Sequence, residues 1–137
     1  MAQPRGSDER SDAREQSVML LYEAEQRGVS VEVLLSERGV ANVDLTRELV
    51  SGVESMRDEL DRDIETHAKG WALDRMPAVD RAILRLGIFE LRQRHDVPLA
   101  VVIDEAVELA KRFSTDDSGR FVNGVLAAVA KGVRREE

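Results

Sequence analysis

Residues 77–98 read PAVDRAILRLGIFELRQRHDVP, and this stretch decides the class of fold. Proline suits the first turn of a helix, where its missing N–H is not needed, so Pro77 marks a helix start. Apolar side chains then recur at the spacing of one helix face, at Val79, Ile83, Leu86 and Leu91. Pro98 ends the segment, because the residue before a proline is pushed away from helical geometry. The stretch therefore predicts an amphipathic helix followed by a break.

The same helical period recurs upstream of this stretch. A first helix is expected to start near Ser11 or Asp12, either a competent N-cap, and to stop at Gly28; a short helix follows over residues 30–37. A stripe with steps of three and four residues then predicts one long helix, which Gly70 closes. The members of this stripe are Leu45, Leu49, Val53, Met56, Leu60 and Ile64.

Downstream of Pro98 two more helices are predicted, over residues 99–113 and 119–131, with a polar turn at residues 114–118. No run alternates polar and apolar residues over a useful length, and the Asn123-Gly124 pair lies inside a helical pattern. Amphipathic helices with short connections favour an all-α fold, here a compact bundle of about seven helices.

The composition is typical of one small soluble domain. The chain has 137 residues, of which 42% are hydrophobic and 34% charged. We expect residues 1–10 to form a flexible tail and residues 11–137 a single all-helical domain. No apolar run approaches the roughly 20 residues of a membrane span, the N-terminus lacks the apolar core of a signal peptide, and cysteine is absent. These features favour a cytoplasmic protein with no membrane contact.

The net charge of −7 argues against a nucleic-acid partner, but the charge is unevenly spread. Residues 69–94 carry six basic and three acidic side chains. The arginines in this window are Arg75, Arg81, Arg85, Arg92 and Arg94. They could form a nucleic-acid surface, or they could pair within the molecule with the acidic face of the long helix, at Asp58, Glu59, Asp61, Asp63 and Glu65.

Catalytic machinery is not recognisable in the sequence. It has no phosphate-binding glycine-rich loop, no nucleophile elbow and no cysteine. The two histidines, His67 and His95, lie in different segments, and the acidic residues 58–65 lack the loop spacing of a calcium site. The sequence therefore predicts neither an enzyme, nor a metal site, nor a bound cofactor.

Two features of the sequence could bind RNA. Arg5, Arg10 and Arg14 could meet phosphates, although the interleaved acidic residues leave the first 14 residues with no net side-chain charge. A solvated helix terminus is the other interpretation. Phe121 could stack on an unpaired base, or it could be an ordinary core residue at helical spacing.

Taken in order, several segments resemble the NusB family of bacterial transcription antitermination factors. They are Ala13-Arg14-Glu15, Leu20-Leu21-Tyr22, Trp71-Ala72-Leu73-Asp74-Arg75, Ile83-Leu84-Arg85-Leu86, Phe89-Glu90-Leu91, Asp96-Val97-Pro98, Asp104-Glu105-Ala106-Val107-Glu108-Leu109-Ala110-Lys111 and Phe121-Val122-Asn123-Gly124-Val125-Leu126. The resemblance implies a helical protein without catalysis that pairs with NusE, a ribosomal small-subunit protein. The pair would bind the single-stranded boxA element of nascent ribosomal RNA and join the RNA polymerase antitermination complex.

The resemblance also implies site residues. It assigns RNA contacts to Arg10, Arg14, Asp117, Arg120 and Phe121. It assigns a surface that faces NusE to Tyr22, Asp80 and Arg81. Ser11 and Asp12 stand where family members often carry arginine, and the loss of two phosphate contacts would weaken RNA binding and flatten its salt dependence.

A rival hypothesis is a protein–protein adaptor that docks NusE or self-associates without touching RNA. The charge-balanced N-terminal segment favours the adaptor, and the basic window at residues 69–94 disfavours it. Tyr22 and Trp71 are amphipathic residue types that are common at interfaces, and they also serve as half-buried anchors. We further expect a homodimer, in which one copy would hide the RNA surface of the other.

Overall fold

The computed structural model describes residues 9–38 and 43–135, and within these ranges the chain is all-α, as predicted. The helices are α1 (Glu9–Arg27), α2 (Val31–Glu37), α3 (Val43–Ser55), α4 (Arg57–His67), the 3₁₀ helix η1 (Leu73–Arg75), α5 (Ala78–Gln93), α6 (Leu99–Phe113) and α7 (Asp116–Val133). None of these helices is long and apolar enough to cross a lipid bilayer. The helix predicted at residues 99–113 has the predicted bounds.

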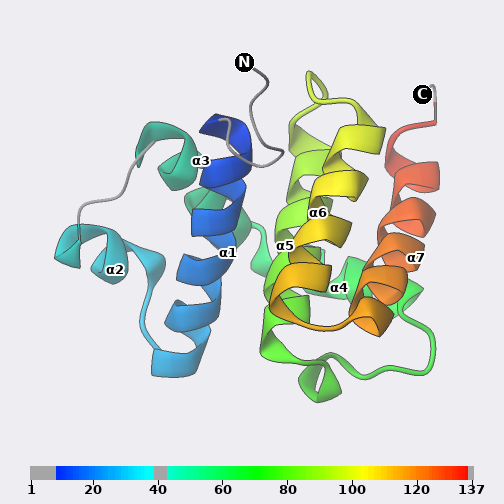
Figure 1. The fold of residues 1–137 in the computed structure, drawn as a ribbon, viewed down its shortest axis with the longest axis horizontal. Coiled ribbons are helices and arrows are strands. Elements are labelled where there is room, and N and C mark those ends of the chain that lie inside the picture. The colour runs from blue at the N-terminus through cyan, green and yellow to red at the C-terminus, as the bar shows by residue number, and fades with distance from the viewer. Residues whose placement is uncertain (1–8, 39–42, 136–137) are drawn as a thin grey trace.

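Helix α5 is the centre of the bundle, and α1, α3, α4, α6 and α7 all pack against it. Its residues from Ala82 to Leu91 are all buried. Figure 1 shows that the start of α1, the α5–α6 connection and the end of α7 lie at one end of the molecule, which we call the Arg10 end. The opposite end holds η1, the start of α5 and the start of α7, and we call it the cavity end.

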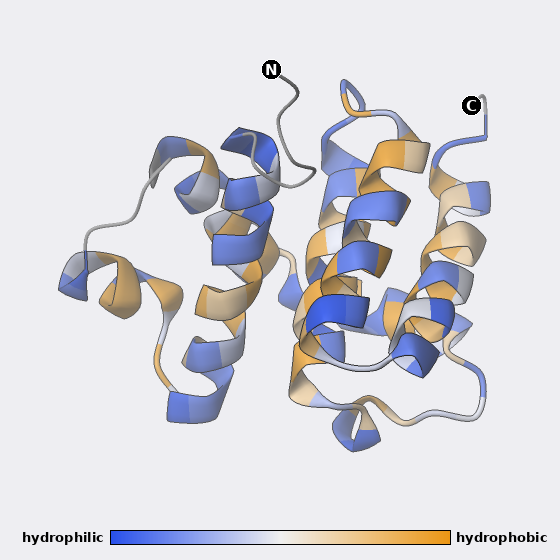
Figure 2. Ribbon diagram, viewed as in Figure 1, coloured by the Kyte–Doolittle hydropathy of each residue, from blue (hydrophilic) through white to orange (hydrophobic). Residues whose placement is uncertain are grey.

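The core is built from aliphatic side chains, because the chain has few aromatic ones. In Figure 2 the hydrophobic faces of the helices turn toward one another and the hydrophilic faces turn outward. A separate, smaller cluster joins α2 to α1 and α3; its buried members are Leu20, Ala24, Val31, Leu34, Leu35 and Val50. Helix α1 ends at Gly28, whose φ of 68° lies in the left-handed region that favours glycine, as the sequence predicts.

The prediction of one long helix over the stripe from Leu45 to Ile64 is wrong, although the stripe does face the core. Met56 leaves helical geometry, with φ −112° and ψ 15°, and separates α3 from α4. The reason is tertiary: both helices pack on α5, but α3 also packs on α1 while α4 also packs on α7. The break at Met56 lets the two segments reach these different partners. Gly52 permits the close approach of α3 to α5, since a Cβ there would lie 2.2 Å from Cζ of Phe89.

Two helix starts also differ from the prediction. Helix α7 begins at Asp116 rather than at residue 119, because Thr115 is its N-cap and accepts a hydrogen bond from the Ser118 N–H at 3.0 Å. Helix α1 begins at Glu9, so Glu9 and Arg10 are helical. The remainder of the predicted tail, residues 1–8, lies outside the described residues.

At the Arg10 end, a buried arginine holds the α5–α6 connection to the end of α7. Arg134 is 5% exposed and donates hydrogen bonds to the backbone carbonyls of Leu91 at 2.8 Å and Val97 at 2.7 Å. It also donates to the carbonyls of Glu90 and Arg94. Arg134 therefore links the end of α5 and the α5–α6 connection to the end of α7.

Candidate nucleic-acid and partner interface

The cavity end contains an aromatic pocket between the residues that flank η1, the start of α5 and the start of α7. The rings of Trp71 and Phe121 lie 6.1 Å apart between centroids, at an interplanar angle of 59°. They flank a cavity of about 380 Å³, which Asp80 and Asp117 also line. Trp71 is 54% exposed, the largest value among the exposed large hydrophobic residues of the described chain. Phe121 is half-buried, so its ring serves both the core and the pocket.

Asp80 lies in the wall of this cavity and is only 2% exposed. Its Oδ2 accepts a hydrogen bond from the Ser118 hydroxyl at 2.8 Å. Ser118 is held in turn by the N-cap of α7, because its backbone N–H donates to Thr115 Oγ1. The other carboxylate oxygen of Asp80, Oδ1, is buried and has no hydrogen-bond partner among the described residues.

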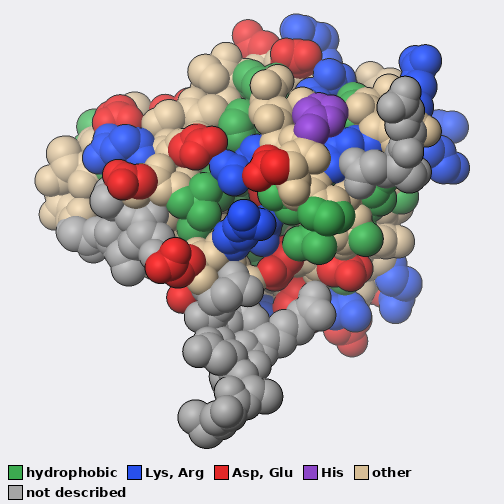
Figure 3. Space-filling model, turned by 90° about the horizontal axis from the view of Figure 1, so that it is seen from above, with side chains coloured by type: hydrophobic (Ala, Val, Ile, Leu, Met, Phe, Trp, Pro, Cys, Tyr) green, Lys and Arg blue, Asp and Glu red, His purple; other side chains and the backbone are tan. Residues whose placement is uncertain are grey.

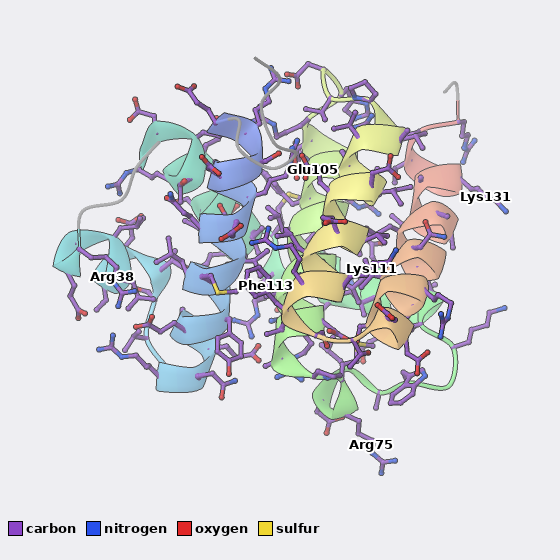
Figure 4. The ribbon with its side chains drawn as sticks, viewed as in Figure 1. Arg38, Arg75, Glu105, Lys111, Phe113 and Lys131 are labelled. Atoms are coloured by element: carbon purple, nitrogen blue, oxygen red, sulfur yellow. The ribbon has the colours of Figure 1, made fainter. Side chains whose placement is uncertain are left out.

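The rim of the cavity carries charges of both signs. Asp117 and Arg120 form an exposed ion pair on the first turns of α7. Lys69 and Arg75 are exposed and make no ion pair with any described residue, and Arg75 points away from the body of the molecule (Figure 4). Three of the residues that the resemblance assigns to RNA, Asp117, Arg120 and Phe121, thus lie together here.

The two remaining residues assigned to RNA, Arg10 and Arg14, lie at the opposite end of the molecule. Arg10 is exposed. Arg14 is 5% exposed, and its Nε lies 2.9 Å from Glu90 Oε2 while its Nη1 lies 3.4 Å from Glu105 Oε1. Ser11 donates to the same Glu105 carboxylate. A phosphate contact by Arg14 would therefore require that this arginine leave Glu90.

The Arg10 end carries charges of both signs. Figure 3 shows the Arg10 end from above, with basic and acidic side chains interspersed across this face. Arg10 and the cavity therefore do not form one continuous patch in the described structure, and a single RNA strand would have to run along the bundle to reach both.

The basic window at residues 69–94 pairs largely within the molecule, which is the second of the two interpretations left open by the sequence. Arg85 Nε lies 2.7 Å from Asp61 Oδ1, and Arg92 Nε lies 2.7 Å from Asp63 Oδ2. Arg94 pairs with Glu48 at 2.9 Å. The hydrogen bonds that Arg92 donates to the Asp63 carboxylate raise the pKa of Arg92 above its ordinary value, despite partial desolvation. These arginines are charged, but their charge is already compensated.

Glu25, near the end of α1, joins this network to the first half of the chain. It accepts hydrogen bonds from Arg81 and Arg85, with Arg85 Nη1 at 2.7 Å from Glu25 Oε2. Burial would raise the pKa of Glu25, but the hydrogen bonds from Arg81 and Arg85 outweigh it and hold that pKa below its ordinary value. Arg81 also donates to the carbonyl oxygens of Leu73 and Met76, so each nitrogen of its guanidinium has a hydrogen-bond partner.

The surface assigned to NusE is divided by the fold. Tyr22 is 36% exposed on α1, and Arg81 is held by Glu25 one turn further along that helix. Asp80 instead lies in the aromatic cavity with Phe121 and Asp117. Contacts of Tyr22, Asp80 and Arg81 with NusE stay predictions, and Asp80 could meet a partner only through the cavity.

The sequence argument did not bring Trp71 and Phe121 together, and it did not expect Asp80 to be buried. The sequence held only separate signals for them: Trp71 is an amphipathic type common at interfaces, and Phe121 could stack on a base or pack in the core. Across residues 9–38 and 43–135, no group of three or more His, Asp or Glu side chains is arranged to hold a metal ion. The fold and the site together define an all-helical binding protein with an aromatic cavity and charged rim at one end.

Comparison with known proteins specifies the class further. The model of the NusB family matches residues 11–131, and the chain belongs to the NusB family. The chain is 55% identical to the transcription antitermination protein NusB of Saccharopolyspora erythraea, over 88% of this chain and 86% of that protein. It is 46% identical to the NusB of Streptomyces griseus, over 93% of this chain and 98% of the relative.

Solved structures agree with this assignment. NusB of T. maritima superposes with a TM-score of 0.78 at 36% identity, over 96% of this chain and 93% of that one. A crystal structure of the antitermination factors NusB and NusE in complex with dsRNA matches with a TM-score of 0.81 at 30% identity, over 90% of this chain and 97% of that one. The family suggested by the sequence motifs is therefore confirmed.

Proposed function

We propose that this protein is a transcription antitermination factor that binds the boxA element of nascent ribosomal RNA together with NusE and joins the RNA polymerase antitermination complex. The observation that carries this proposal is the match over 90% of the chain to a NusB solved with both NusE and RNA. The protein acts without catalysis, as a rigid helical platform, and it works in the cytoplasm, where its RNA is made.

The geometry supports different contacts for different residues of this platform. Phe121 and Trp71 offer aromatic faces for unpaired bases at the cavity end. Arg120, Arg75 and Lys69 are exposed near them and can meet phosphates. Arg10 adds a phosphate contact at the other end, and Arg14 supports it indirectly by fixing the start of α1 on Glu90. Tyr22 and Arg81 contribute to the surface for NusE.

The proposal is tested by fluorescence anisotropy of a labelled boxA RNA, titrated with the protein alone and with NusE, at two salt concentrations. We expect salt-sensitive binding that NusE strengthens, because phosphate contacts release counterions and NusE enlarges the surface. A scrambled RNA of equal length is the matched control. Equal affinity of the protein–NusE pair for both RNAs would contradict the proposal.

The adaptor hypothesis keeps a specific observation in its favour. Most arginines of the basic window are paired internally, and Arg14 is buried, so few cations are free for RNA. An adaptor would bind NusE in the same titration while labelled RNA stays free in every condition. The predicted homodimer is tested separately by sedimentation, where a single monomer mass across micromolar concentrations would contradict it.

A further inference from the structure

We propose that the cavity of Trp71, Phe121 and Asp80 receives one unpaired nucleobase that carries an exocyclic amino group, and that Asp80 Oδ1 accepts a hydrogen bond from this amino group. The inference rests on the RNA binding proposed above and adds a base preference to it. The combination of two aromatic walls with a buried, unpartnered acceptor points to a flat ligand that donates N–H.

The acceptor is the most specific feature of the cavity. Asp80 is 2% exposed, and only its Oδ2 has a described partner, the Ser118 hydroxyl at 2.8 Å. Ser118 is itself fixed by Thr115 and Ser114, so the carboxylate is held in one orientation before any ligand arrives. A buried carboxylate oxygen without a donor is unfavourable, and a donor on the ligand would remove that cost.

The walls have the chemistry and the size for a base. Tilted rings 6.1 Å apart flank a cavity of about 380 Å³, which falls in the range of small-ligand cavities. Aromatic side chains stack on every base, so the walls supply affinity and the acceptor supplies selectivity. Because Oδ1 is buried, an entering base must shift a wall, and Trp71, which is 54% exposed, is the wall that the protein covers least.

Basic side chains near the cavity can serve a nucleotide, whereas they would oppose the arginine of a protein partner. Lys69, Arg75 and Arg120 are exposed and lie within two residues of Trp71, Met76 and Phe121 in the chain, all of which line the cavity. Lys69 and Arg75 have no ion pair within the described part of the chain. These cations can meet the phosphates that flank a base and would repel a guanidinium, and the exposed carboxylates of Asp74, Asp116 and Asp117 offset part of their charge.

The acceptor predicts which bases are preferred. Cytosine presents an amino donor at the position where uracil presents a carbonyl oxygen. The carboxylate of Asp80 accepts a hydrogen bond from the cytosine amino group and repels the uracil carbonyl oxygen. Adenine and guanine also carry amino groups, so cytosine and uracil form the better-matched pair for a test, since their rings have nearly the same size.

The experiment titrates the full chain with 12-nucleotide oligo(rC) and oligo(rU), using anisotropy of end-labelled RNA and, with unlabelled RNA, the fluorescence of Trp71, the single tryptophan. We expect about 5- to 10-fold tighter binding of oligo(rC). Stacking in the cavity should also quench Trp71. Asp80→Asn should bring the affinity ratio close to one, because an amide can turn either its oxygen or its N–H toward the base.

Two further variants keep the test decisive. Asp74→Asn removes an exposed carboxylate at the same end that does not line the cavity. It should strengthen the binding of both RNAs alike and leave the ratio of their affinities unchanged. Trp71→Leu changes an exposed wall of the cavity and is expected to fold. It should weaken the binding of oligo(rC) and reduce the preference for oligo(rC) over oligo(rU). If Asp80→Asn fails to fold, Trp71→Leu still tests the proposal.

Equal affinities for the two RNAs in the wild-type protein, with unchanged Trp71 fluorescence, would overturn the base pocket and leave RNA binding intact. A Trp71 response to NusE alone, with none to RNA, would overturn it in favour of a protein contact. If neither these oligonucleotides nor boxA RNA bind, with or without NusE, the proposed function fails as well.

Discussion

The residues that the family resemblance assigns to RNA lie at both ends of the bundle, and their surroundings differ between the two ends. At the Arg10 end, Arg14 is buried against Glu90 and Glu105 and stabilises the junction of α1, α5 and α6. At the cavity end, Trp71 and Phe121 stay accessible above a buried carboxylate. An arginine in the sequence is therefore a weak sign of free positive charge, because the fold decides whether its partner is a phosphate or a glutamate.

Arg14→Ala should give the largest effect and tests whether Arg14 is structural. Removing one partner of a buried ion pair leaves Glu90 uncompensated, so the free energy of unfolding should fall by about 3–5 kcal/mol. Urea denaturation measures this change. Arg10→Ala is the control and should stay within about 0.5 kcal/mol of wild type, since Arg10 is exposed. Wild-type stability of Arg14→Ala combined with weak RNA binding would instead make Arg14 a direct ligand.

Phe121→Ala tests the cavity end. Loss of one stacking surface should weaken boxA binding by about 1–3 kcal/mol, measured by anisotropy in the presence of NusE. Phe113→Ala is the matched control, because Phe113 is an exposed aromatic residue at the end of α6 whose ring contacts Arg112 and does not line the cavity. An equal loss of affinity in both variants would count against a role for the cavity.

Salt titrations of Arg120→Ala and Arg10→Ala show whether one RNA strand spans both ends. Each phosphate contact on a single strand contributes about 0.7 to the slope of log affinity against log salt. We expect each variant to flatten the slope by about this amount. A flattened slope for Arg120→Ala with an unchanged slope for Arg10→Ala would confine the RNA to the cavity end.

The smallest expected effect concerns Glu25, which binds Arg81 and Arg85. Since folding lowers the pKa of Glu25 below its ordinary value of 4.5, its contribution to stability is present above that pH. The contribution is lost as the pH falls through the lower pKa of the folded state. Glu25→Gln should therefore flatten the acid side of the stability profile below pH 4.5, by about 1 kcal/mol or less because the site is partly solvated. Denaturation curves at several acidic pH values measure this, and an unchanged profile would contradict it.

The helical order could be predicted from the sequence because periodicity is local. The stripe from Leu45 to Ile64, the proline at residue 98 and the glycine at residue 28 each act through neighbouring residues. The break at Met56 could not be predicted in this way. It has no proline or glycine beside it and arises because α3 and α4, which both contact α5, have different further partners, α1 and α7.

The candidate site was predicted in part. Asp117, Arg120 and Phe121 are close in the chain and lie on consecutive turns at the start of α7, so their proximity follows from the sequence. Trp71 and Asp80 join them only because the segment before η1 and the start of α5 fold against α7. The burial of Arg14 by Glu90 and Glu105 likewise depends on helices far apart in the sequence.

By itself the sequence determined the all-α class, the aliphatic core and the membership in the NusB family, because helix period, caps and motifs are properties of short segments. Only the tertiary structure decided which charges are free. Ion pairing and burial depend on residues brought together from distant segments, and at the cavity end they leave Asp80 Oδ1 unpartnered while Arg85 and Arg92 are paired.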